Sequence, residues 1–206
     1  MEKITTIKSK FLKNIFDQNT YVLTKGNEVV LVDAGAELED VILEVQNKKV
    51  LAVFLTHIHF DHVWNLEKYV EKFDCDVYVV EGAEEKFLDA EKNASTIMRQ
   101  RLVFNIAQNK IKYYAKKLKV GKFDFEVFET PGHSSDCVCI LWKNNLFVGD
   151  TIFADGIGRT DLYDSSNSNM IDSLNLIKQI DFETAYPGHY GFANKAKINQ
   201  VINYYL

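Results

Sequence analysis

The chain has 206 residues, of which 47% are hydrophobic and 26% charged, and it carries a formal net charge of −5. This size and composition lead us to expect a single globular domain over residues 1–206. The acidic balance argues against a nucleic-acid partner, because nucleic-acid binding depends on clustered Lys and Arg. The three cysteines fit free, packed thiols. Neither a signal-like start nor an apolar run of about 18 residues is present, so we expect a cytoplasmic protein without a membrane partner.

The first half of the chain alternates short β-rich runs with helical patterns. The turn residues Lys25-Gly26-Asn27 predict a hairpin between its first two strands. The predicted elements are strands at 21–24 and 29–33, a helix at 38–46, a buried strand at 50–55, a helix at about 63–73 and a strand at 77–80.

The middle of the chain, residues 82–118, is mostly polar and predicts two or three short helices with loops. Its basic run, Lys110 to Lys119, is interpreted as a solvated helix face or a connector. The β signal then returns. The remaining predicted elements are strands at 123–130, 137–142 and 146–149, a helix at 170–180, a short strand at 184–186 and a closing helix at 193–206. This order indicates two sheets covered by helices.

All five histidines lie in short motifs that are typical of metal ligands, and the first motif holds three of them. His57-x-His59-x-Asp61-His62 follows the buried strand directly. In extended backbone His57, His59 and Asp61 would face one side, whereas His62 would point elsewhere and could serve a second ion. Imidazole nitrogens with a carboxylate suit Zn²⁺, Fe²⁺ or Mn²⁺.

The other two histidines end matching triplets, Pro131–His133 and Pro187–His189, which contain the only prolines of the chain. The glycines would let the backbone pass close to a metal and adopt positive φ, and the prolines would fix its approach. Asp150 ends an apolar strand behind a glycine and could bridge two cations or cap a helix. Asp33 ends another strand, and we expect it to orient a ligand imidazole.

In this order, His57-x-His59-x-Asp61-His62, Thr130-Pro-Gly-His133-Ser, Gly149-Asp150-Thr151 and Tyr186-Pro-Gly-His189 resemble the metallo-β-lactamase-fold superfamily. The resemblance spans residues 19–191. The short length and Gly158-Arg159-Thr160-Asp161 resemble the small glyoxalase-II-like hydrolases. The resemblance implies an α/β fold, the αββα sandwich of two mixed β-sheets flanked by helices, with the site at one edge between the sheets.

The resemblance also implies the ligand roles. One ion would be held by His57, His59 and His133, a second by Asp61, His62 and His189, with Asp150 and a water or hydroxide bridging them. Two divalent cations are therefore expected, Zn²⁺ first and Fe or Mn as alternatives. Such a pair lowers the pKa of the water and polarises a carbonyl, and Asp61 is the expected catalytic proton acceptor.

Several residues bear on which branch of the superfamily the chain belongs to. Aspartate at position 61 departs from the diiron oxygen-reducing branch. Glyoxalase II contacts glutathione through a C-terminal helical extension, whereas this sequence ends soon after His189, so the resemblance implies glutathione thioesters less strongly as substrates. Asn65 replaces a common glycine at a turn where asparagine tolerates the left-handed conformation. Arg159 and Asp161 are expected to pair and brace the floor of the site. The alternative is that Arg159 attracts an anionic substrate group.

The resulting functional prediction is a hydrolase that cleaves a thioester or related acyl ester of a small molecule. The main alternative is a persulfide dioxygenase, in which one Fe²⁺ would be held by His57, His133 and Asp150 while His62 and His189 would not be ligands. A lactonase remains open within the hydrolase class, and a nuclease is less favoured. The physiological substrate and the oligomeric state are left open.

Overall fold

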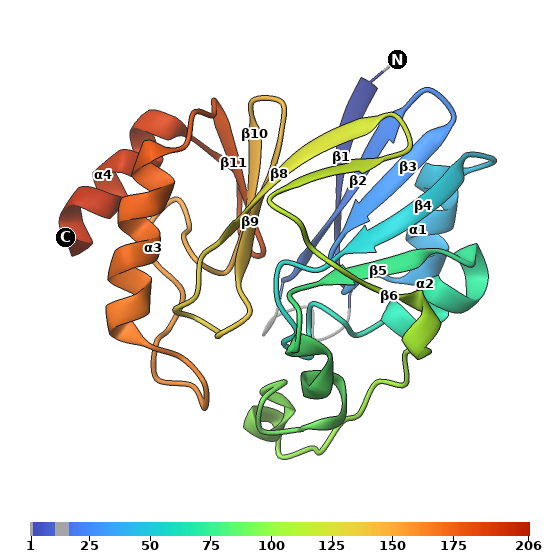
Figure 1. The fold of residues 1–206 in the computed structure, drawn as a ribbon, viewed down its shortest axis with the longest axis horizontal. Coiled ribbons are helices and arrows are strands. Elements are labelled where there is room, and N and C mark those ends of the chain that lie inside the picture. Colours follow the sequence, from blue (N-terminus) through green and yellow to red (C-terminus); the bar gives the residue numbers. More distant parts are fainter. Residues whose placement is uncertain (1, 11–16) are drawn as a thin grey trace.

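The structure is a computed structural model that describes residues 2–10 and 17–206. Two six-stranded sheets pack face to face, and helices cover their outer faces (Figure 1). The strand orders are β1-β2-β3-β4-β5-β6 and β12-β11-β10-β9-β8-β7. Both sheets contain parallel and antiparallel pairs. The predicted αββα sandwich is confirmed.

The first sheet and its helices occupy the first half of the chain. In order, the elements are β1 (Glu2–Lys8), β2 (Asn19–Lys25), β3 (Glu28–Val32), α1 (Leu38–Val45), β4 (Lys49–Phe54), α2 (Leu66–Phe73), β5 (Asp76–Val79) and β6 (Ile111–Tyr113). Between β5 and β6 lie the 3-10 helices η1 (Ala83–Leu88), η2 (Ser95–Met98) and η3 (Gln108–Lys110).

The second sheet and its helices follow. They are β7 (Lys117–Val120), β8 (Phe123–Glu129), β9 (Val138–Trp142), β10 (Asn145–Gly149), α3 (Asn167–Gln179), β11 (Thr184–Pro187), β12 (Ala193–Asn194) and α4 (Lys195–Tyr205). In Figure 1, α1 and α2 flank the first sheet, and α3 and α4 flank the second on the opposite side of the molecule.

Side chains alternate along the buried strands between two cores. In β3, Val29 and Leu31 pack into the cluster beneath α1 and α2, whereas Val30 and Val32 pack between the sheets. Successive residues of a strand point to opposite faces, so a strand buried on both faces reads as an unbroken apolar run. This is why the sequence predicted β3 and β4 correctly.

The structure corrects four details of the predicted elements. The basic run is not a helix: most of it belongs to β6 and β7, the edge strands of the two sheets. β1 was not predicted, the helix expected from residue 63 begins at Leu66, and residues 193–194 form β12 rather than helix. Alternating exposed lysines are a common protection of a sheet edge, which explains the basic composition of β7.

The predicted hairpin and the free, packed cysteines are confirmed. Gly26 lies at φ 64 in the turn of the predicted hairpin, where Lys25 pairs with Glu28. Cys75, Cys137 and Cys139 are buried free thiols. None of the helices in the described ranges is both long and apolar enough to cross a bilayer.

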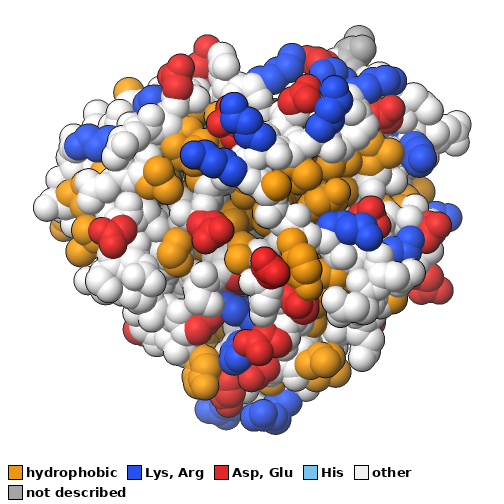
Figure 2. All heavy atoms as spheres, viewed as in Figure 1, with side chains coloured by type: hydrophobic (Ala, Val, Ile, Leu, Met, Phe, Trp, Pro, Cys, Tyr) orange, Lys and Arg blue, Asp and Glu red, His pale blue; other side chains and the backbone are white. Residues whose placement is uncertain are grey.

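On the face drawn in Figure 2, hydrophobic side chains extend across the middle of the molecule, with charged groups of both signs around them.

Candidate metal centre

The candidate ligands lie at the carboxyl ends of four strands, on loops that meet at one edge between the sheets. The segment from His57 to His62 follows β4, His133 follows β8, Asp150 follows β10 and His189 follows β11. The structure therefore brings together side chains that are up to 132 positions apart in the sequence. Apolar strands ending at the same edge account for this convergence.

All seven predicted ligands belong to groups whose donor atoms lie within 4.8 Å of one another. These groups are His57, His59 and His133; His57, His62 and Asp150; and Asp61, His62 and His189. The first and third groups are the two ligand sets that the resemblance implied.

Asp150 lies between those two sets. Its Oδ1 is 3.3 Å from His62 Nε2, and its Oδ2 is 3.2 Å from His189 Nε2 and 3.6 Å from His133 Nε2. A carboxylate in this place can offer an oxygen to each of two ions. Its position fits the bridging role better than the alternative of a helix cap, because residues 151–157 do not form a helix.

The argument from extended backbone was wrong for Asp61. Asp61 Oδ2 lies 3.2 Å from His189 Nε2 and 3.9 Å from His62 Nε2, so this carboxylate groups with the second set rather than with His57 and His59. The chain turns after His59, where the N–H of His62 donates to the His59 carbonyl at 3.0 Å. The turn ends the alternation on which the prediction relied.

The ligand atoms themselves indicate that the site fits divalent cations. Among the described residues, His57 Nε2, His59 Nε2, His62 Nε2 and Asp150 Oδ1 are buried and accept or donate no hydrogen bond. Leaving a polar atom buried without a partner costs about 1–3 kcal/mol. The unpaired atoms of His57, His62 and Asp150 belong to one group of ligand-type residues, and this is the arrangement that a metal coordinated by nitrogen and oxygen would satisfy. His59 faces the first set with its other nitrogen, since its Nδ1 lies 2.9 Å from His133 Nε2.

The protonation of the histidines differs between the two sets. Burial lowers the pKa of His57 and of His59 well below the usual value, so both imidazoles are neutral and able to bind a metal. Burial opposes a charge on His62 as well, but the carboxylates of Asp33 and Asp150 raise its pKa well above the usual value. Without a metal, His62 is therefore protonated, and its positive charge lies beside the carboxylates of the centre.

His189 and Asp150 show the same coupling from both sides. Although burial disfavours a charged imidazole, Asp150 and Asp61 raise the pKa of His189 to about 10. Burial likewise disfavours the Asp150 carboxylate, but His189 and His62 hold its pKa well below the usual value. Carboxylates that retain protons on neighbouring imidazoles would attract a divalent cation to the same place.

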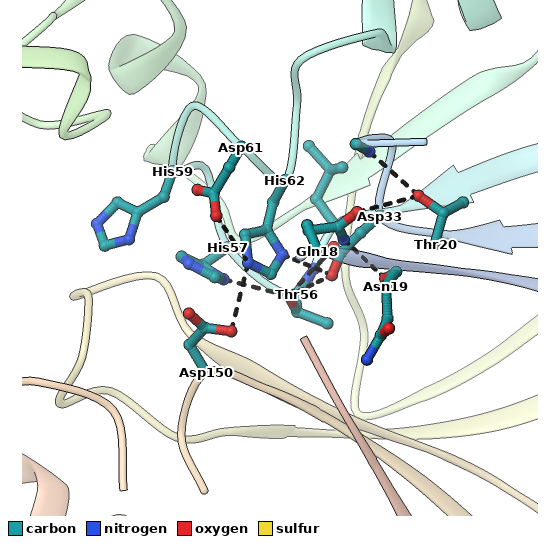
Figure 3. Close-up of polar contacts among 12 residues, drawn as sticks. Gln18, Asn19, Thr20, Asp33, Thr56, His57, His59, Asp61, His62 and Asp150 are labelled. Carbon is teal, nitrogen blue, oxygen red and sulfur yellow. Dashed lines mark hydrogen bonds and ion pairs between the residues drawn. The ribbon is translucent and has the colours of Figure 1, made fainter. Parts of the chain in front are cut away.

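Asp33 contacts a ligand imidazole, as the sequence led us to expect. Its Oδ2 lies 2.8 Å from His62 Nδ1, which leaves His62 Nε2 directed into the centre (Figure 3). The Thr56 backbone N–H and hydroxyl both donate to the Asp33 carboxylate, at 2.8 and 2.9 Å. Asp33 adopts φ 61, outside β3, and this turn directs its side chain toward the site. The sequence analysis did not identify Thr56, although it directly precedes His57.

The Arg159–Asp161 pair forms, but it lies at the exposed rim of the site rather than at its floor. Arg159 Nε and Nη2 donate to the two Asp161 oxygens at 2.7 and 2.8 Å, and the side chains are 56% and 70% exposed. Arg159 reaches a ligand through its main chain, since its carbonyl lies 3.0 Å from His133 Nδ1. Among the described residues, the Asp161 side chain hydrogen-bonds to Arg159 and not to a candidate ligand.

The second Pro-Gly-His loop approaches the site closely. A Cβ atom on Gly188 would lie 2.2 Å from Asp150 Oδ1 and 2.5 Å from His62 Cε1, so only glycine fits there. Asn19 and Tyr21, at the start of β2, donate to the Pro187 carbonyl at 3.0 and 2.5 Å and hold this loop against the first sheet. The close approach matches the sequence prediction, but Gly188 does not adopt positive φ.

Asn65 serves a different purpose from the one predicted. Its φ is −109, so it does not use the left-handed conformation that asparagine tolerates. Its side-chain amide instead donates to the carbonyls of Gly35 and Ala36 at 3.2 and 3.0 Å. The amide thus anchors the loop after Asp33, which a glycine could not do.

A pocket of about 530 Å³ opens over the centre. Its floor includes His59, Asp61, His133, Asp150 and His189. Its walls are mainly apolar and were not identified from the sequence. They are formed by Phe60, Ala94, Ile97, Phe153, Ile157, Leu162 and Tyr190, and Asp17 and Arg159 also line it. The stretch 82–118 supplies two of these residues, Ala94 and Ile97.

Comparison with known proteins gives a consistent picture. The family model described as the metallo-beta-lactamase superfamily matches residues 14–189. A "Probable metallo-hydrolase" of Streptococcus pyogenes is 30% identical over 190 residues, which are 87% of this chain and 82% of that protein. A hydroxyacylglutathione hydrolase of Buchnera aphidicola is 30% identical over 171 residues, but they cover only 60% of that enzyme and 82% of this chain. The crystal structure of the BLEG-1 B3 metallo-beta-lactamase aligns with a TM-score of 0.88 at 25% identity, over 98% of this chain and 99% of that one.

Proposed function

Because this chain belongs to the metallo-beta-lactamase superfamily, we propose that it is a dinuclear metal-dependent hydrolase that cleaves a thioester or a related acyl ester. The observation that carries the proposal is the pair of ligand sets with Asp150 between them. Zn²⁺ is the proposed ion, because three imidazoles in one set and two imidazoles with a carboxylate in the other suit its preference for nitrogen and oxygen ligands.

When bound, two divalent cations supply a water of lowered pKa and polarise a substrate carbonyl. The residues of this chain provide the rest of the chemistry. Asp61, whose side chain is 11% exposed, lines the pocket, and its carboxylate can accept a proton from the attacking water. Asp33 keeps His62 in the tautomer that presents Nε2 to the centre.

The pocket supports a substrate whose reacting acyl group is apolar. Phe60, Phe153 and Tyr190 stand beside the centre and would exclude water around the scissile bond. Arg159 is the only Lys or Arg among the described lining residues, and its guanidinium already binds Asp161 in two places. The similarity to a hydroxyacylglutathione hydrolase therefore supports the acyl-thioester class more strongly than it supports glutathione as the leaving group.

The geometry disfavours the persulfide dioxygenase alternative. That reading leaves His62 and His189 without a ligand role. Yet His62 is fully buried, its Nδ1 is occupied by Asp33, and its Nε2 has no hydrogen bond. An imidazole that a carboxylate fixes on one nitrogen, and whose other nitrogen faces further ligand-type groups such as Asp150 and Asp61, is the usual arrangement of a metal ligand.

The proposal is tested by measuring hydrolysis of a panel of acyl thioesters, aryl esters and lactones with Zn²⁺-loaded protein. We expect thioester or ester turnover that His189→Ala abolishes and that Lys143→Ala, an exposed residue outside the pocket, leaves unchanged. Absence of hydrolysis across the panel by protein with two bound ions would refute the hydrolase. Oxygen consumption by the Fe²⁺-loaded protein with a persulfide would favour the alternative.

A further inference from the structure

Lys86 is a buried lysine that belongs to neither ligand set and does not line the pocket. It lies in η1, is 4% exposed, and donates from Nζ to Ser134 Oγ at 2.8 Å, to Asp136 Oδ1 at 2.6 Å and to Asp164. Three acceptors match the three protons of an ammonium group. A buried charge is costly unless it is paired in this way, so the site needs an explanation.

Two acceptors of Lys86, Ser134 and Asp136, lie on the loop that carries His133, and Asp136 also contacts the loop of His57 and His59. Ser134 directly follows His133. Asp136 uses its other oxygen, Oδ2, to accept the backbone N–H of Ile58 at 2.9 Å, and Ile58 stands between His57 and His59. Lys86 and Asp136 thus connect the loops that carry all three histidines of the first ligand set.

The third acceptor extends the network to the wall of the pocket. Asp164 follows the segment from Gly158 to Leu162, three residues of which line the pocket. Asp164 also accepts from the Ser135 hydroxyl at 2.7 Å, so the pocket loop and the His133 loop share this carboxylate. One ammonium group therefore joins η1, both histidine loops and the pocket loop.

We propose that Lys86 is a positioning residue that fixes the separation of the His57–His59 and His133 loops and anchors the pocket loop at Asp164. This inference rests on the proposed metal centre, but it concerns metal affinity and pocket order rather than a particular reaction. Charge supports it. Without the ammonium, the buried Asp136 carboxylate and the half-buried Asp164 carboxylate would lose their shared cation, and their repulsion would favour moving the loops apart.

The direct test replaces Lys86 by methionine, which has a similar length but no charge. The readouts are Zn²⁺ affinity by competition with a chelator, with the two binding steps resolved, and the visible spectrum of the Co²⁺ form. We expect Lys86→Met to weaken one step roughly 10- to 100-fold, the range seen when residues behind metal ligands are changed. The matched control is Lys92→Met, since Lys92 pairs with Glu85 on the exposed side of the same segment.

Two further variants extend the test, and the first keeps it decisive if Lys86→Met does not fold. Asp164→Asn retains the Lys86–Asp136 pair, so it should raise KM while both metal affinities stay at the wild-type level. Lys86→Met combined with Asp136→Asn should recover part of the affinity lost in Lys86→Met, because it removes one uncompensated carboxylate. If Lys86 only filled space, Asp164→Asn would not raise KM at unchanged metal affinity, and the double variant would not recover metal affinity.

Wild-type affinities and an unchanged Co²⁺ spectrum in Lys86→Met, together with an unchanged KM in Asp164→Asn, would overturn the proposal. Failure of the hydrolase assignment would appear differently. In that case the wild-type protein would bind metal without hydrolysing any substrate, while the affinity loss in Lys86→Met would remain measurable.

Discussion

Gly188→Ala tests the geometry of the centre by adding a single methyl group. The new Cβ would lie 2.2 Å from Asp150 Oδ1, whereas ordinary contacts of this kind begin at 3.4 Å. The Asp150 oxygen, or the loop that carries His189, must therefore move by about 1.2 Å, which is the difference between those two distances. Asp150 cannot yield freely, since the same oxygen lies 3.3 Å from His62 Nε2.

A displacement of about 1 Å in a catalytic group can lower a rate on the order of 100-fold. Overpacking of this kind also costs about 1–3 kcal/mol of stability. We therefore expect Gly188→Ala to lose at least one ion on dialysis and to lose on the order of 100-fold in kcat/KM. Metal content by mass spectrometry and the melting temperature with and without Zn²⁺ provide the assay.

The matched control lies three residues further along the same loop. A Cβ on Gly191 would meet no atom within 4 Å, so Gly191→Ala should retain both ions and full activity. A Gly188→Ala protein that binds two ions with wild-type affinity and rate would refute the close approach of this loop to Asp150. Equal losses from both substitutions would show that the effect does not come from the close approach of Gly188 to Asp150.

Four other predictions follow from the contacts at the centre. Asp33→Asn keeps the size of the side chain but removes its charge. The affinity for the ion held by His62 should therefore fall roughly 10- to 100-fold, as measured by competition with a chelator. An unchanged affinity would contradict the role of Asp33. In the metal-free protein the pKa values of His62 and His189 are raised, that of His189 to about 10. Binding of Zn²⁺ at pH 7 should therefore release protons from these imidazoles, and calorimetry in buffers of different ionisation enthalpy would count the protons. The proton on His189 stabilises the metal-free fold below the ordinary pKa of 6.5, and this contribution should disappear as the pH rises through about 10, which melting curves would follow. Arg159→Gln should leave metal content unchanged, because the Arg159 side chain binds Asp161 and only its carbonyl contacts a ligand; loss of an ion in this variant would be inconsistent with that geometry.

The elements of the fold that could be predicted are those whose pattern is local. Strands such as β3 and β4 are buried on both faces and appear as apolar runs, and the ligands follow them directly. The edge strands β1, β6 and β7 are only partly buried and rich in charged residues, so they do not carry this signal.

The parts of the site that could not be predicted depend on contacts between distant segments. Lys86 lies in a polar stretch and has the composition of a surface residue, and its partners are 48 to 78 positions further along the chain. The apolar pocket is similarly assembled from loops around Phe60, Ile97 and Phe153. Reasoning from extended backbone placed Asp61 with His57 and His59, which is wrong. The spacing of the motif does not reveal the hydrogen-bonded turn between His59 and His62 that redirects Asp61.

The most direct test of the dinuclear centre is the metal content per chain of protein purified without chelator and without added metal, measured for the wild type and for His189→Ala. We predict nearly two ions per chain in the wild type and the loss of one in the variant, because His189 belongs to only one of the two ligand sets. A single ion that is retained when His189 is replaced would contradict the dinuclear centre and the hydrolytic function proposed from it.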